Sequence, residues 1–315
     1  MSLQYIIDYF LENKIFIFIF FILCFAQCLV RFIKRKIKSS TYQNLSDRIR
    51  SWWIIVISLF VALSDRRLFL IYLSFIMFLG VKEYFSIIDI RPTDRKLVFL
   101  MYLTVPFQTY FIYIKWYEVF VIFIPVYVFF FLSAVITLEQ KTQGILKAGG
   151  TMFWGMMINV YSIGYIGYLY NLYPTSENTS IIGRNLVVYI LFLTESNDVF
   201  QYIWGKALGK RKIIPMISPN KTWAGFIGGA VSTGILSFII SPILFKNNFL
   251  ISFIFGTGIA VLGFIGDIFI SGIKRDLNLK DTSQLIPGHG GILDRMDSLI
   301  FVSPLFFHLI YYLYY

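Results

Sequence analysis

Residues 249–271 read FLISFIFGTGIAVLGFIGDIFIS, an apolar run whose single charged side chain is Asp267. A helix of this length rises about 34 Å, which is enough to cross a hydrocarbon core of roughly 30 Å. Apolar runs of this kind recur along the 315-residue chain, which is 57% hydrophobic and only 14% charged. No long polar stretch of mixed composition interrupts them, so the composition excludes an ordinary water-soluble domain and predicts a membrane protein.

The spacing of these runs predicts an all-α fold, a polytopic membrane helix bundle with about ten transmembrane or near-spanning helices. The first run precedes its basic residues and ends without a small-residue cleavage site, so we interpret it as a retained helix rather than a signal peptide. The second and third runs are short, which leaves a shallow helical hairpin across residues 51–85 as an alternative. The expected segments are 5–31, 51–64, 68–82, 97–114, 117–137, 152–171, 184–204, 222–241, 249–271 and 298–315.

Basic residues predict the orientation of the bundle. If alternate loops lie on alternate sides, one side holds 22 lysines and arginines and the other holds 5. The loops of the basic side are residues 31–50, 82–96, 139–147, 206–221 and 274–295. Because lysine and arginine are retained on the cytoplasmic face during insertion, these loops are expected to face the cytoplasm and both termini the outside. The net charge of +11 is then a one-sided surface for anionic membrane lipids. No nucleic-acid-binding module is recognisable, so we expect no nucleic acid partner.

Several carboxylates lie in or beside the expected spans. A carboxylate near the bilayer centre costs about 2.5–3.5 kcal/mol on insertion scales, so Glu195, Asp198 and Asp267 require partners. A polar cavity open to the cytoplasm would supply them. If the ninth segment stays helical beyond residue 271, Asp267, Ser271 and Lys274 recur at i, i+4 and i+7 and share one polar face.

A glycine-rich loop follows this segment. Pro287 and the neighbouring Gly288, Gly290 and Gly291 break the chain into a loop whose backbone can approach a ligand closely. Asp294 and Asp297 then stand three residues apart at the start of the last helix. Paired carboxylates beside lysines and arginines suit magnesium holding a polyphosphate, with a second cation as an open alternative. The alternative reading is that the acids balance the dipole at a helix start.

Other polar residues of this segment have two readings. His289 stands between two glycines, where an imidazole is placed to donate hydrogen bonds to phosphate. Asp276, Lys280 and Asp281 are equally compatible with a solvated loop.

Two blocks of sequence resemble the signature of the phosphatidate cytidylyltransferase (CDP-diacylglycerol synthase) family, over roughly residues 185–315. The first block contains Ser271, Ile273, Lys274, Arg275, Lys280, Asp281, Ser283, Ile286, Pro287, His289, Gly290, Gly291, Ile292, Asp294, Arg295 and Asp297. The second contains Glu195, Asn197, Asp198, Gly205, Lys206, Gly209, Lys210, Ser218, Pro219, Asn220, Lys221, Thr222 and Gly225. The chain departs from the usual family pattern at residues 195–199 and at Ala224, which bears on the nucleotide contacts and the lipid substrate.

The resemblance implies that CTP and phosphatidic acid, or a related lipid phosphate, are joined to give CDP-diacylglycerol and pyrophosphate in phospholipid biosynthesis. It implies N-terminal transmembrane helices at 1–180 and a C-terminal transmembrane catalytic core at 181–315, within one integral membrane domain. Magnesium is expected on Asp267, Asp294 and Asp297. The catalytic residues are expected to be Asp267, Lys274, Arg275, Asp294, Arg295 and Asp297. Substrate-binding residues are expected at Glu195, Asp198, Ser218, Asn220, Lys221, Ser271, Lys280, His289, Gly290 and Gly291.

Location, assembly and the competing functions complete these expectations. We expect the inner, cytoplasmic membrane with the active site facing the cytoplasm, and a homodimer stays an open option. A cytidylyltransferase for an isoprenoid or another lipid phosphate would carry the same motifs. A lipid transporter or flippase would also use intramembrane acids, but transporter sites lie near the bilayer midplane between inverted repeats, and no matching pair of broken helices is seen in the first half of the chain.

Overall fold

The computed structural model describes residues 14–34, 39–138, 142–172, 183–241, 249–286 and 290–315. Within these ranges the chain is helical, with isolated β-bridges and no strand, so the predicted all-α fold is confirmed. The elements are α2 (Lys14–Ile33), α3 (Ser39–Ala62), α4 (Arg66–Ile87), η2 (Pro92–Asp94), α5 (Arg95–Tyr113), α6 (Tyr117–Ile122), η3 (Phe123–Val128), α7 (Phe129–Leu138), α8 (Ile145–Met156), η4 (Met157–Ser162), α9 (Ile163–Tyr170), α10 (Gly183–Leu208), α11 (Trp223–Ile240), α12 (Phe249–Asp276), α13 (Leu293–Met296) and α14 (Leu299–Tyr314).

Six helical segments of the described chain are long and apolar enough to cross a membrane. They are 15–32, 66–87, 117–138, 223–240, 249–276 and 293–314. The other predicted spans are also helical, in α3, α5, α8–η4–α9 and α10. The short second and third runs extend into helices of 24 and 22 residues, about 36 and 33 Å long, so length no longer favours a shallow hairpin.

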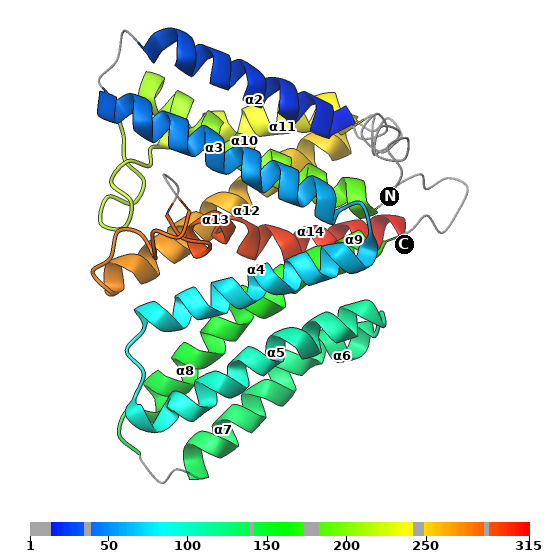
Figure 1. Ribbon diagram of the computed structural model, residues 1–315, viewed down its shortest axis with the longest axis vertical. Helices are drawn as coiled ribbons and strands as arrows, with labels where there is room; N and C mark the ends of the chain where they lie inside the picture. Colours follow the sequence, from blue (N-terminus) through cyan, green and yellow to red (C-terminus); the bar gives the residue numbers. More distant parts are fainter. Residues whose placement is uncertain (1–13, 35–38, 139–141, 173–182, 242–248, 287–289) are drawn as a thin grey trace.

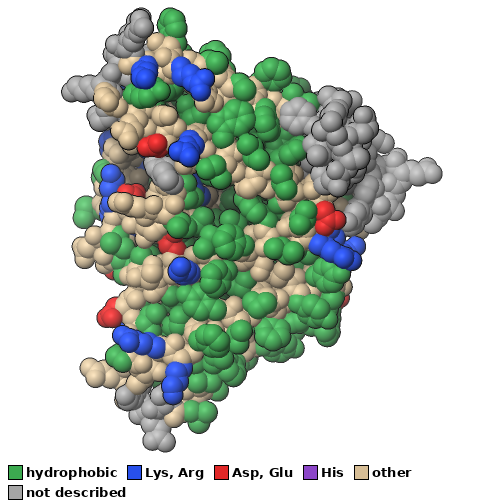
Figure 2. Space-filling model, viewed as in Figure 1, with side chains coloured by type: hydrophobic (Ala, Val, Ile, Leu, Met, Phe, Trp, Pro, Cys, Tyr) green, Lys and Arg blue, Asp and Glu red, His purple; other side chains and the backbone are tan. Residues whose placement is uncertain are grey.

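The helices run between two sides of the bundle. In Figure 1, α2 begins and α14 ends at the right, whereas α4 and α12 end at the left. The ends that border the basic loops therefore lie on one side. In Figure 2 most lysines and arginines of the visible face lie in the left half, and hydrophobic side chains dominate the right half apart from a charged cluster. This arrangement agrees with the alternation predicted from the basic residues.

Small residues let α10, α11 and α12 pack closely. A Cβ atom added at Gly229 of α11 would lie 2.5 Å from Gln201 Cγ of α10. One added at Gly256 of α12 would overlap Ser237 Cβ and lie 2.6 Å from the Thr233 carbonyl oxygen, both on α11. Such close approach of backbones is typical of helix packing in membranes. It holds the three helices side by side.

The position of α4 is fixed by contacts at its start and along its length. Asp65 caps this helix through hydrogen bonds from the backbone N–H groups of Arg67 and Leu68, at 2.8 and 3.2 Å. Arg66 donates to Asn171 Oδ1 at 2.7 Å, which ties the start of α4 to the end of α9. Further along, Gly80 lies against η4, because an added Cβ would be 2.5 Å from Asn159 Oδ1. These contacts fix the direction in which the far end of α4 points.

We predict that Gly256→Ala lowers the melting temperature of the detergent-purified protein, because the new methyl group overlaps α11. Overpacking of this kind costs about 1–3 kcal/mol. Gly258→Ala, two residues away in the same helix, is the matched control, since nothing lies within 4 Å of an added Cβ there. The control is expected to melt no lower than the parent, since alanine favours helix. Equal melting temperatures for both variants would contradict the packing.

Candidate active site

The polar face predicted on α12 is present. This helix continues to Asp276, and Ser271 Oγ donates to Asp267 Oδ1 at 3.2 Å. One turn further on, the Lys274 ammonium lies 2.6 Å from Asp294 Oδ1. Lys274 and Asp294 are only 8% and 6% exposed. The predicted i, i+4, i+7 pattern is confirmed, and it leads from the bundle interior to the loop before α13.

Asp294 organises that loop. Its Oδ2 atom accepts hydrogen bonds from the backbone N–H groups of Thr282 and Gly291, both at 3.0 Å, and lies 2.9 Å from the Thr282 hydroxyl oxygen. Gly290 has φ +84°, in the left-handed region that favours glycine, and an added Cβ would lie 2.8 Å from Asp294 Oδ2. Both oxygens of Asp294 therefore have partners within the protein, and the residue holds the loop to α12.

A second group of carboxylates lies deeper. Asp198 of α10, Asp267 of α12 and Asp297 at the end of α13 repel one another electrostatically. Close approach of the backbones brings them together, because a Cβ at Gly266 would overlap the Asp297 carbonyl oxygen. Asp198 Oδ1 is buried without a hydrogen-bond partner among the described residues. We call Asp198, Asp267 and Asp297 the acidic cluster.

Lys221 forms an ion pair with the acidic cluster. Its ammonium lies 2.7 Å from Asp267 Oδ2 and donates to Gln201 Oε1 at 2.9 Å. Burial alone would lower the pKa of Lys221, but attraction by Asp267 and Asp198 outweighs burial and raises the pKa. The ammonium therefore stays charged at neutral pH.

The loop between α10 and α11 presents Lys221 to the cluster. Lys212 and Thr222 form an isolated antiparallel bridge across it, and Thr222 caps α11 by accepting from Gly225 N–H at 3.1 Å. The Lys221 N–H donates to the Ser218 carbonyl at 3.3 Å, which closes a turn whose Asn220 is exposed. The two sequence blocks thus meet at one place, as predicted.

The remaining predicted residues divide into three groups. Arg295 and Glu195 lie within electrostatic range of Asp198, and Arg295 Nε is buried without a hydrogen-bond partner among the described residues. Arg275 donates to the carbonyl oxygens of Ile217 at 3.1 Å and Leu279 at 2.9 Å, so its guanidinium joins two loops. Lys280 is exposed at the rim, and His289 lies outside the described residues.

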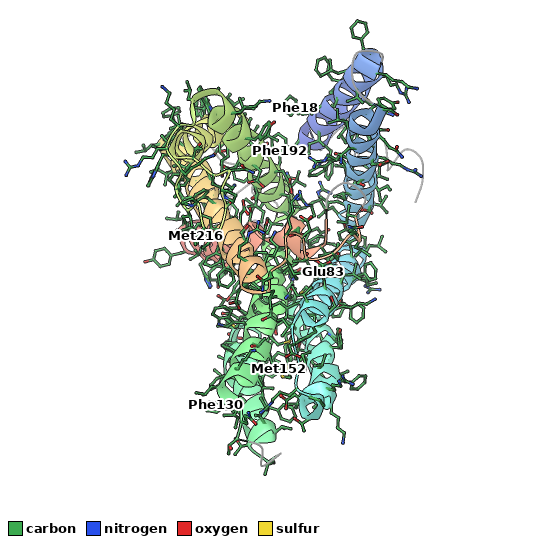
Figure 3. All side chains as sticks on the ribbon, turned by 90° about the vertical axis from the view of Figure 1, so that its left-hand side faces the viewer. Phe18, Glu83, Phe130, Met152, Phe192 and Met216 are labelled. Carbon is green, nitrogen blue, oxygen red and sulfur yellow. The ribbon has the colours of Figure 1, made fainter. Side chains whose placement is uncertain are left out.

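Glu83 of α4 is a site residue that sequence reasoning missed. Its side chain, 6% exposed, accepts hydrogen bonds from the Ser283 hydroxyl and the Ile292 N–H, both at 2.9 Å. Leu293 N–H donates at 3.1 Å, and the Thr282 hydroxyl donates as well. Figure 3 shows Glu83 pointing from α4 toward α13 at the centre of the molecule. The sequence signal for Glu83 is an acid inside a long apolar helix. The basic loop expected at residues 82–96 included Glu83, so the sequence did not place it in a helix.

The site fits a divalent cation in part. In the described chain, no three His, Cys, Asp or Glu side chains are arranged as a ready-made metal site. Magnesium, however, needs only one or two carboxylates when substrate phosphates and water supply the other ligands. The mutually repelling oxygens of the acidic cluster and the unpartnered Asp198 Oδ1 have the chemistry that such an ion requires.

Fold and site together define an integral-membrane enzyme whose charged groups come from α10, the loop before α11, α12 and α13. The sequence model of the cytidylyltransferase family matches residues 46–313, and the chain belongs to this family. The protein is therefore a membrane nucleotidyltransferase, as the sequence blocks predicted.

Individual relatives are similar over different lengths. The uncharacterized protein YnbB of Escherichia coli is 37% identical over 295 residues, 93% of this chain and 96% of that protein. A phosphatidate cytidylyltransferase of Rickettsia prowazekii is 36% identical over 190 residues, 52% of this chain and 83% of that enzyme. A phosphatidate cytidylyltransferase of Bacillus subtilis is 38% identical over 151 residues, 46% of this chain and 55% of that enzyme.

We predict opposite effects of two Asp→Asn changes on stability. Asp294→Asn leaves the buried Lys274 ammonium without its carboxylate, and breaking a buried pair costs about 3–5 kcal/mol. Asp297→Asn removes one of three mutually repelling carboxylates and keeps an oxygen for the Ser298 N–H, so the melting temperature should stay equal or rise. Thermal unfolding in detergent compares the two variants. A loss in Asp297→Asn as large as in Asp294→Asn would contradict the different roles assigned to these residues.

Proposed function

We propose that the protein transfers the cytidylyl group of CTP to phosphatidic acid, giving CDP-diacylglycerol and pyrophosphate. The observation that carries the proposal is the acidic cluster beside Lys221, within a membrane helix bundle of the cytidylyltransferase family. The names of the Rickettsia and Bacillus relatives support phosphatidate as the acceptor. A lipid phosphate would reach this site from the surrounding bilayer.

The reaction needs charge neutralisation more than a general base. An oxygen of the lipid phosphate attacks the α-phosphorus of CTP, and the bond from that phosphorus to the oxygen bridging the β-phosphate breaks. A phosphomonoester has a second pKa near 6, so the nucleophile is already largely ionised at neutral pH. Its approach to a triphosphate is repulsive, and cations placed around the phosphates are the expected source of catalysis.

The residues divide this work. Asp198, Asp267 and Asp297 would hold magnesium, which neutralises triphosphate charge when bound. Lys221 and Arg295 are the cations next to the acidic cluster and would contact phosphate oxygens. Asp294 is assigned to holding the loop, because its oxygens bind Lys274 and the backbone N–H groups of Thr282 and Gly291 in that loop. This changes the metal set expected from sequence.

Six other residues near the acidic cluster and the loop before α13 stay candidates for substrate contacts. They are Ser218, Asn220, Ser271, Lys280, Gly290 and Gly291. Within this proposal the site faces the cytoplasm, where CTP is made, and the membrane is the cytoplasmic one. The basic side of the bundle supports that orientation by the positive-inside rule.

A different lipid phosphate is the second candidate acceptor. The departures at residues 195–199 and Ala224 lie in the block that carries Asp198 and Lys221. An isoprenoid phosphate would present the same phosphate chemistry to the same cations, so the acceptor has to be measured. A transporter is disfavoured, because the chain belongs to the cytidylyltransferase family over residues 46–313.

We predict that purified protein with magnesium and CTP labelled in its α-phosphate forms labelled CDP-diacylglycerol and pyrophosphate in equal amounts when phosphatidic acid is supplied. An isoprenoid phosphate should give much less product. Asp297→Asn should lower turnover by about a hundredfold or more, since it removes a proposed metal ligand from a correctly folded protein. Asp276→Asn, an exposed acid at the end of the same α12, is the control and should keep full activity. Absence of any nucleotide–lipid product from either acceptor would refute the proposed reaction.

A further inference from the structure

We infer that Glu83 is a positioning residue that holds the two ends of the loop before α13 in the geometry required for cytidylyl transfer. The inference rests on the proposed function, because that loop borders the proposed site. Glu83 belongs to α4, in the part of the chain where the sequence motifs predict no site residue.

The contacts of Glu83 cross the loop from one end to the other. Oε2 accepts from the Ser283 hydroxyl on the near end and from the Ile292 N–H on the far end, both at 2.9 Å. Oε1 accepts from the Thr282 hydroxyl and from the Leu293 N–H at 3.1 Å. Each oxygen therefore joins residues 282–283 to residues 292–293. The backbone hydrogen bond from the Ile286 N–H to the Gly290 carbonyl oxygen, at 2.9 Å, is a further link across the same loop.

The fit around Glu83 is close. A Cβ atom added at Gly291 would overlap Glu83 Oε1, so the loop backbone lies directly against the carboxylate. The four donors from the described residues are neutral, so the interaction depends on acceptor geometry rather than on an ion pair. A buried carboxylate that lost these donors would be strongly destabilised, which keeps the loop on Glu83.

Thr282 links Glu83 to the rest of the site. Its hydroxyl lies within hydrogen-bond distance of Glu83 Oε1 and of Asp294 Oδ2, but one hydroxyl has one proton to donate. Asp294 in turn pairs with Lys274 of α12. The network therefore runs from α4 through the loop to the helix that carries Asp267. A substitution of Glu83 should therefore shift the positions of the acidic cluster side chains, although Glu83 does not contact them directly.

The choice of variants follows from the geometry. Glu83→Gln keeps the size of the side chain but replaces one acceptor oxygen with an NH₂ donor, which would face a hydroxyl or N–H group of the loop. Glu83→Asp keeps both acceptors but is one methylene shorter, so it should restore part of the loop order. Glu118→Gln, an exposed glutamate of α6, is the matched control for the Glu→Gln change.

The experiment measures loop geometry separately from activity. Spin labels are placed at Leu285→Cys and Tyr312→Cys, which are 56% and 88% exposed, after the exposed Cys24 and Cys28 are replaced by serine. The inference predicts a broader distance distribution in Glu83→Gln, an intermediate one in Glu83→Asp and an unchanged one in Glu118→Gln.

Activity supplies the second readout. The kcat of Glu83→Gln for CDP-diacylglycerol formation should fall by about tenfold to a hundredfold, with KM for phosphatidic acid within about twofold of the parent value, as expected for a misplaced catalytic group. Glu83→Asp should recover part of kcat. A parent-like distance distribution together with parent-like kcat in Glu83→Gln would overturn the inference. If the parent forms no CDP-lipid, the proposed function fails, and the distance distribution still decides whether Glu83 holds the loop.

Discussion

A carboxylate inside a membrane protein must be met by a cation or by hydrogen-bond donors, because lipid supplies neither. The structure meets this constraint differently for each acid. Glu83 is surrounded by neutral donors from one loop, and Asp294 combines such donors with Lys274. Asp267 pairs with Lys221 but also lies next to the like charge of Asp297. The first two acids are satisfied and shape the protein, whereas the three carboxylates of the acidic cluster repel one another beside two cations, Lys221 and Arg295, and a divalent cation would offset that repulsion.

The sequence predicts the elements well, because their signals are local. Apolar length locates the helices, and basic residues identify the side that carries the loops. The polar face of α12 follows from helical periodicity alone, so Asp267, Ser271 and Lys274 were placed correctly. The two motif blocks also meet in space as expected. What sequence cannot assign is the partner of each charge. Glu83 and Ile292 are 209 positions apart, and no local pattern connects them.

The role of Asp294 shows the same limit. Its spacing from Asp297 suggested that both acids bind one cation, yet the two side chains, at the start and the end of α13, have different partners. The structure also extends the functional unit beyond the motif-rich segment at 185–315. Through Glu83, α4 becomes part of the frame that positions the loop, although it lies in the half of the chain where the sequence blocks predict only hydrophobic helices. Family membership covers both halves, since the match spans residues 46–313.

In the proposed reaction, cytidylyl transfer depends on a cation bound by the acidic cluster. Manganese can replace magnesium as a spectroscopic probe, and its binding to the detergent-purified protein can be titrated by electron paramagnetic resonance without any turnover. The account predicts saturable manganese binding that is lost in Asp297→Asn and retained in Asp276→Asn. Manganese binding of unchanged affinity in Asp297→Asn would contradict it.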